Sequence, residues 1–132
     1  MFEDKQPAGP FTNVKSFHDW FALTTNPGRE TEISPIFAQP WRDGLLDKST
    51  IIFTHADLHR SNIMISRNED GKPYIIGLID WHQSGWYPAP WEYYKTRRTC
   101  KNNEQWETDW ILEFLRSHSG YVCWEFFASS LV

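Results

Sequence analysis

The chain has 132 residues, of which 40% are hydrophobic and 17% aromatic, including 8 tryptophans. This length suits one domain with a real core, in which large rings usually pack, although a sugar- or base-stacking surface is an alternative. The net charge is −4, from 13 basic and 17 acidic residues, which gives nucleic-acid binding little electrostatic support. The densest basic cluster, Lys95, Arg97 and Arg98, is expected on a solvated helix face.

The start of the chain argues against a signal peptide, because residues 1–10 are acidic and contain proline. We expect them to be a flexible lead-in. No stretch approaches the roughly 18 apolar residues of a membrane-spanning helix. Two cysteines, Cys100 and Cys123, leave a disulfide open but have no metal-type spacing. A soluble protein of the reducing cytoplasm is the expectation.

A first helix is predicted to begin near Asn13 or Ser16, because Ser16 and Asp19 resemble a capping box. The Asn-Pro-Gly sequence at residues 26–28 ends it. Residues 29–48 contain prolines and only weak periodicity, so they are predicted to be loop or short helix.

Three strand-like runs follow, at residues 50–54 (TIIFT), 62–66 (NIMIS) and 73–79 (PYIIGLI). Residues 68–72, with Asp-Gly at their centre, predict a hairpin between the second and third runs. Asp57 then lies on the loop after one strand, and Asp80 at the end of another. Loops on a rigid scaffold often carry catalytic groups.

The last part of the chain is predicted to be mainly helical. A glycine and two prolines in residues 85–90 break the chain before a helix at about 91–98. A third helix is predicted at about 104–118, and residues 121–132 are a last helix or strand. The third helix carries an apolar stripe that we expect in the core, made of Trp106, Trp110, Ile111, Phe114 and Leu115.

Asp57, Asn62 and Asp80 carry the chemical signal. An aspartate and an asparagine five positions apart on a tight loop can converge on one small volume. The carboxylate can deprotonate a hydroxyl, and the amide oxygen can bind a hard cation such as Mg²⁺. Asp80 is placed to complete a metal clamp on the phosphates of ATP. An Asp or Asn after a strand is also a common turn former, so the joint pattern matters more than any one residue.

The pattern resembles the aminoglycoside phosphotransferase and choline kinase-like family, within the protein-kinase-like superfamily. The residues that carry the resemblance are HADLH at 55–59, Asn62 and IDW at 79–81. Gly-Pro-Phe at 9–11 and GWYPAPWEYYK at 85–95 are similar to the fungal-type version of the family. Trp81 stands where protein kinases have a phenylalanine, as is normal in this branch.

The resemblance implies a role for each matching residue. Asp57 matches the aspartate that handles the acceptor hydroxyl, and His55, the second residue of this catalytic set, matches the one that braces the loop. Asn62 and Asp80 match the two metal ligands and so the residues that bind the cofactors, Mg²⁺ and ATP. Glu92 matches a structural acidic position. His59 is expected to shape the acceptor side.

The resemblance also implies an α+β fold, with residues 11–132 forming a partial domain. This domain is a mainly helical C-terminal lobe of a protein-kinase-like fold, with a small β-hairpin carrying the catalytic and metal-binding loops. The N-terminal lobe is expected to be absent: no two of the 7 glycines form G-x-G, and Lys5, Lys15 and Lys48 have loop or helix contexts. We therefore predict weak or no independent phosphorylation of small hydroxylated molecules.

Two other functions remain open. The alternation of His55, Asp57 and His59, with Asp80 and His82, could bind Zn²⁺ or Mn²⁺ in a metal-dependent hydrolase. A non-catalytic fragment of a kinase-like scaffold could instead bind a partner protein, or itself, through an exposed lobe interface. No nucleic-acid or membrane partner is expected.

Overall fold

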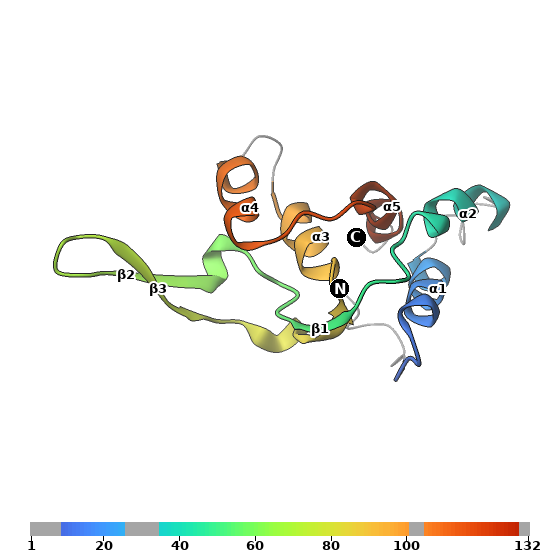
Figure 1. Ribbon diagram of the computed structural model, residues 1–132, viewed down its shortest axis with the longest axis horizontal. Helices are drawn as coiled ribbons and strands as arrows, with labels where there is room; N and C mark the ends of the chain where they lie inside the picture. Colours follow the sequence, from blue (N-terminus) through green and yellow to red (C-terminus); the bar gives the residue numbers. More distant parts are fainter. Residues whose placement is uncertain (1–8, 26–34, 101–104, 130–132) are drawn as a thin grey trace. The chain divides into compact units, whose positions relative to one another are not determined.

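The computed structural model describes residues 9–25, 35–100 and 105–129 (Figure 1). These residues form a small α+β protein with five α-helices and two two-stranded antiparallel sheets. The chain divides into two compact units, which we call the helical unit (residues 1–50 and 119–132) and the site unit (residues 51–118). Most of the predicted lead-in lies outside the described residues. Among the described residues, no helix is both long and apolar enough to span a bilayer.

The helical unit contains three helices, α1 (Val14–Thr25), α2 (Pro35–Asp43) and α5 (Tyr121–Ala128). The predicted start of α1 is confirmed, but Asn13 is the cap: its Oδ1 accepts from the Ser16 N–H at 2.8 Å. The Ser16 Oγ accepts from the Asn13 N–H at 3.3 Å, so the two residues satisfy each other's donors. The capping box that we predicted between Ser16 and Asp19 is therefore wrong.

The core of the helical unit is aromatic, as expected. The rings of Phe21 and Trp124 stack at 6.3 Å, and Phe127 meets Phe21 edge-on at 6.0 Å. All three side chains are fully buried. Gly44 lets the chain after α2 approach α5, because a Cβ at this position would lie 2.2 Å from the Cys123 Sγ. Both described cysteines are free, so no disulfide joins them.

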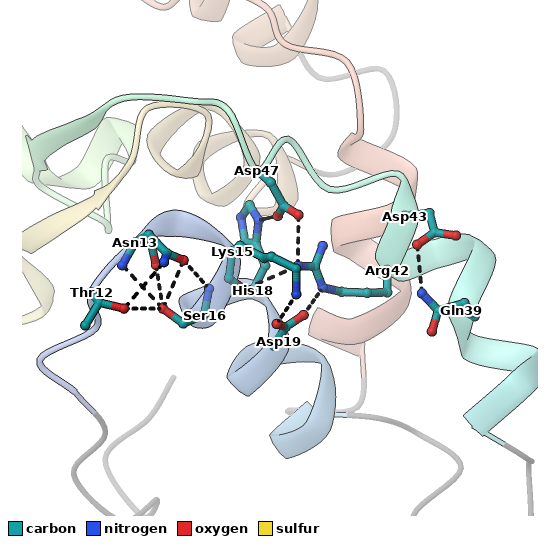
Figure 2. A network of polar contacts seen from close by, with 10 residues as sticks. All are labelled: Thr12, Asn13, Lys15, Ser16, His18, Asp19, Gln39, Arg42, Asp43 and Asp47. Carbon is teal, nitrogen blue, oxygen red and sulfur yellow. Dashed lines mark hydrogen bonds and ion pairs between the residues drawn. The ribbon is translucent and has the colours of Figure 1, made fainter.

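A polar network ties the elements of the helical unit together (Figure 2). The Arg42 side chain donates to Asp19 on α1 at 2.8 Å and to Asp47 on the following loop at 3.0 Å. Asp47 also accepts from the Nδ1 of buried His18, at 2.8 Å. Asp19, which sequence reasoning assigned to the cap, instead bridges Lys15 and Arg42.

The site unit contains four strands: β1 (Ile51–Thr54), β2 (Ile63–Arg67), β3 (Pro73–Leu78) and β4 (Gly85–Pro88). The predicted hairpin is confirmed: β2 pairs with β3, and Gly71 takes a positive φ in the turn between them (Figure 1). The strand β4 was not predicted. It pairs with β1, and Pro88 is tolerated because it lies at the strand end.

Two helices complete the site unit, α3 (Trp91–Arg98) and α4 (Ile111–Phe114). The predicted bounds of α3 are confirmed. The long third helix is wrong: a π-helical turn (Trp106–Trp110) precedes α4, and Leu115 is already extended. Since i→i+5 pairing changes which residues share a face, the predicted apolar stripe does not stay in the core. Ile111 is buried, whereas Trp110 and Phe114 are exposed.

Candidate active site

The candidate site begins where β1 ends, at a strained turn held by a buried carboxylate. Ala56 has a φ of 62°, a left-handed conformation that non-glycine residues rarely adopt. The Glu92 side chain, in the first turn of α3, accepts from the His55 N–H at 2.7 Å and from the Ala56 N–H at 3.1 Å. These bonds favour a backbone conformation that would otherwise cost about 1–3 kcal/mol. The acidic position at Glu92 thus has a physical task, which is to hold the loop of Asp57.

His55 connects this loop to the end of β3. Its side chain is buried, its Nδ1 accepts from the Asp57 N–H at 3.2 Å, and its Nε2 lies 2.9 Å from the Ile79 carbonyl oxygen. A carbonyl only accepts, so Nε2 carries the proton. The Trp81 ring covers the imidazole, with centroids 4.5 Å apart. With both ring nitrogens engaged, the geometry gives His55 a bracing task and not that of a proton acceptor.

Asn62 joins the same arrangement from the last position of a short helical turn (Arg60–Asn62), directly before β2. Its Nδ2 donates to the Asp57 carbonyl oxygen at 2.9 Å and to the Asp57 Oδ2 at 3.3 Å. Its own carbonyl accepts from the Ile79 N–H at 3.0 Å. Because Nδ2 faces Asp57, Oδ1 is the side-chain atom that can bind a cation.

Asp80 follows Ile79 directly, so the β2–β3 pairing brings Asn62 and Asp80 onto neighbouring backbone segments. Asp80 takes a left-handed conformation, with φ 66° and ψ 57°, and its side chain is 48% exposed. Its Oδ1 pairs with the His82 Nδ1. One carboxylate and one amide oxygen are hard donors of the kind that Mg²⁺ takes when phosphates supply other ligands, so these residues fit the metal implied by the resemblance.

The structure does not support the metal-dependent hydrolase. Both imidazole nitrogens of His55 are occupied by backbone groups, and the His59 Nδ1 pairs with the Ser61 Oγ at 2.8 Å and accepts from the Ser61 N–H. Within the described part of the chain, no three His, Cys, Asp or Glu side chains gather to hold a metal ion. His59 caps the short helical turn that contains Asn62 (Arg60–Asn62), which is a local structural task.

Sequence reasoning missed the part that Lys95 and Gln83 play near the site. The expected solvated basic face is wrong for Lys95, whose side chain is buried and donates to the Gln83 Oε1 at 2.7 Å. One signal was available: Lys95 follows Glu92 by three positions, so both lie on the same face of α3. Its burial depends on a partner distant in sequence and could not be read from this spacing.

Of three comparisons with known proteins, one finds a match. No curated protein and no solved structure matches the chain significantly. A family model, described as the Phosphotransferase enzyme family, matches residues 13–125, which is most of the chain. That span includes Asp57, Asn62 and Asp80. The chain belongs to the Phosphotransferase enzyme family.

Proposed function

We propose that this chain is the catalytic-loop part of a fungal-type aminoglycoside phosphotransferase-like protein, with the C-terminal lobe of a kinase-like fold. Its reaction is the ATP-dependent phosphorylation of a hydroxyl group on a small molecule, in the cytoplasm. The observation that supports the proposal is a chain of hydrogen bonds: Asn62 donates to Asp57 and accepts from the Ile79 N–H, directly before Asp80.

Each residue has a distinct task in this reaction. The Asp57 carboxylate accepts a hydrogen bond from the acceptor hydroxyl and takes its proton as the phosphoryl group arrives. Asn62 Oδ1 and the Asp80 carboxylate would hold Mg²⁺, which would supply charge neutralisation on the phosphates. His55 and Glu92 keep the Asp57 loop in place through their backbone hydrogen bonds.

Weak or absent turnover by this chain alone is part of the proposal. Its glycines form no G-x-G sequence, and none of the described strands contains a lysine. A general base contributes roughly 10²–10⁴-fold, whereas phosphoryl transfer depends mainly on positioning the phosphates and stabilising their charge. Asp57 therefore represents the smaller share of the catalytic power, and the metal donors contribute to the larger share only when a nucleotide is held against them.

A metal-binding and turnover experiment tests the proposal. We expect Mg²⁺ with ATP to raise the melting temperature of the chain, and Asp80→Asn to abolish this shift. Asp70→Asn, in the exposed hairpin turn, removes the same charge away from the site and should leave the shift intact. Clear turnover of small hydroxyl compounds that is lost in Asp57→Ala would overturn the inactivity, and a shift that persists in Asp80→Asn would overturn the metal site.

A second function is favoured by the exposed apolar side chains of both sheets. Phe53 on β1 and Trp86 on β4 are exposed, and their rings meet at 5.6 Å, while the β2–β3 hairpin exposes Ile65 and Ile75. Exposed apolar surface of this kind marks association sites. We propose that this surface binds a partner protein or a second copy of the chain.

Light scattering after size exclusion tests this second function. We expect concentration-dependent association that weakens in Trp86→Ser. Leu23→Ser is the matched control, since Leu23 is equally exposed but lies on α1 in the helical unit. A chain that is monomeric at all concentrations would contradict self-association, and equal effects of the two substitutions would contradict this surface.

A further inference from the structure

Lys95 is a buried cation for which the proposed reaction has no task. Its side chain is only 7% exposed, and lysine is almost never buried unless it is paired. Its Nζ donates to the Gln83 Oε1 at 2.7 Å. A neutral amide is a weak compensation for a desolvated ammonium, so the position of Lys95 calls for a further physical reason.

The position of Lys95 on α3 supplies one. Glu92 and Lys95 lie three residues apart on one helix face. Glu92 holds the backbone of His55 and Ala56, directly before Asp57. Lys95 holds Gln83, the last residue of the short helical turn (Trp81–Gln83) that follows Asp80. One face of α3 therefore bonds to both chain segments that carry the site.

The charges around Lys95 agree with this placement. Burial lowers the pKa of the Lys95 ammonium, while the negative charges of Asp57 and Glu92 act in the opposite direction, Asp57 more strongly. Arg98, on the same helix, adds to the lowering. Asp57 is therefore the strongest of the charges that favour the ammonium form of Lys95.

We infer that Lys95 is a positioning residue of the site: through Gln83 it fixes the segment that carries Asp80 to α3, as Glu92 fixes the segment that carries Asp57. The inference rests on the proposed function for the use of Asp80 as a metal ligand. It assigns no contact between Lys95 and the substrate.

The affinity for Mn²⁺, an oxygen-seeking probe of the Mg²⁺ site, separates positioning from charge alone. Removing a nearby positive charge by itself would strengthen cation binding. Loss of a positioning contact weakens it, typically by roughly 10–100-fold for groups that orient metal ligands. We therefore expect Lys95→Met to bind Mn²⁺ about tenfold more weakly than the wild type, measured by electron paramagnetic resonance of free Mn²⁺.

Two further variants complete this arm of the experiment. Gln83→Leu removes the acceptor and keeps the lysine, so it should weaken Mn²⁺ binding in the same direction, and it replaces Lys95→Met if that variant does not fold. Lys72→Met is the matched control, because it removes the same charge from an exposed position in the hairpin turn. It should bind Mn²⁺ as the wild type does.

A second measurement needs neither metal binding nor turnover. The His55 Nε2–H, which donates to the Ile79 carbonyl, should give a slowly exchanging signal in ¹⁵N nuclear magnetic resonance. We expect this signal to broaden or disappear in Lys95→Met and Gln83→Leu, and to remain in Lys72→Met.

The two readouts separate the possible failures. If the wild type binds no Mn²⁺, the metal site of the proposed function fails, and the His55 signal alone decides the inference. Weaker Mn²⁺ binding or a lost His55 signal in folded Lys95→Met supports the positioning task. An unchanged His55 signal, together with unchanged, stronger or absent Mn²⁺ binding, overturns it.

Discussion

Each of the two units of the chain has its own kind of interior. In the helical unit, fully buried aromatic rings form the core, and the Arg42 network joins α1 to the loop that carries Asp47. The site unit also buries aromatic rings, those of Trp91 and Tyr94, but its buried set adds His55, Glu92 and Lys95, while many apolar side chains on its strands are exposed. Apolar burial is non-directional, whereas hydrogen bonds fix atoms in direction and distance.

The difference indicates what each unit is built to do. Stacked rings tolerate small shifts of the helices around them. A carboxylate that accepts from two successive backbone N–H groups does not, because a shift leaves buried donors unsatisfied. The site unit places directional bonds at the residues before Asp57 and after Asp80, where accurate placement is needed for the phosphoryl transfer that we propose.

The largest effect is expected from Glu92→Ala, which removes the acceptor of the His55 and Ala56 N–H groups. Leaving both donors buried next to the strained Ala56 should lower the free energy of unfolding by about 3 kcal/mol. Urea denaturation followed by tryptophan fluorescence measures this. Glu113→Ala, at an exposed position on α4, is the matched control and should stay within about 0.5 kcal/mol of the wild type.

A conservative change at the same position shows whether direction or charge matters more. Glu92→Gln keeps one acceptor oxygen and loses the charge. Because charge-assisted bonds are about twice as strong as neutral ones, Glu92→Gln should lose roughly half as much stability as Glu92→Ala. If Glu92→Ala and Glu113→Ala destabilised the chain equally, the site unit would not depend on this carboxylate.

A smaller effect is expected from Gly44→Ala in the helical unit. The added Cβ would lie 2.2 Å from the Cys123 Sγ, so either the Cys123 side chain must rotate or the loop after α2 must move away from α5. Overpacking of this kind costs about 1–3 kcal/mol. Thermal unfolding measures the loss, and Gly77→Ala, whose Cβ would meet nothing within 4 Å, is the control.

A second substitution should relieve the clash at Gly44. Cys123→Ala removes the Sγ, so the double variant should be more stable than Gly44→Ala alone. Without this rescue, the destabilisation at Gly44 would come from the backbone and not from the contact with Cys123.

The sequence predicted those features that depend on neighbouring residues. The apolar spacing of α1, the Asp-Gly hairpin and the helix after the prolines are all local, and the structure contains them. The strand β4 was missed because its partner β1 is distant in the chain, and a glycine and a proline obscured it. The exposed Trp110 and Phe114 were missed because a π-helical turn changes the face that each residue presents.

The candidate site also has features that the sequence predicted and features that it did not. The spacing of Asp57, Asn62 and Asp80 pointed to one site, since residue types and spacing are visible in one sequence. The contacts that hold these residues were not visible, because they join distant segments: Glu92 to the His55 backbone, and Lys95 to Gln83. The sequence does not distinguish a buried lysine from an exposed one, because burial depends on tertiary contacts.

The smallest predicted effect is a pH dependence of the helical unit at His18. Burial lowers the pKa of this imidazole below its ordinary value of 6.5, and the hydrogen bond to Asp47 opposes this only in part. The neutral ring therefore donates its Nδ1–H to Asp47. The unfolded chain takes up the proton more readily, so stability falls as the pH is lowered through 6.5.

The Asp47 carboxylate acts in a separate and lower window. Burial alone would raise its pKa, but the hydrogen bonds from Arg42 and His18 outweigh burial and lower it below 3.8. Its contribution to stability is present above this value and is lost only at more acidic pH. A decline that begins near pH 6.5 therefore reports histidine and not the aspartate. His118 shares this window with His18, because burial and the nearby Arg116 lower the pKa of His118 as well.

A substitution separates the proton from the hydrogen bond. His18→Asn places an amide N–H near the position of the ring Nδ1–H and cannot take up a proton, so the decline between pH 7 and pH 5 should become shallower, leaving the part that comes from His118, while part of the bond to Asp47 remains. Urea denaturation at a series of pH values measures this. His82→Asn, which changes an exposed histidine of the site unit, is the control and should keep the decline. If His18→Asn kept the wild-type slope, the buried imidazole would not be its source, and the polar network of the helical unit would be as insensitive to pH as its aromatic core.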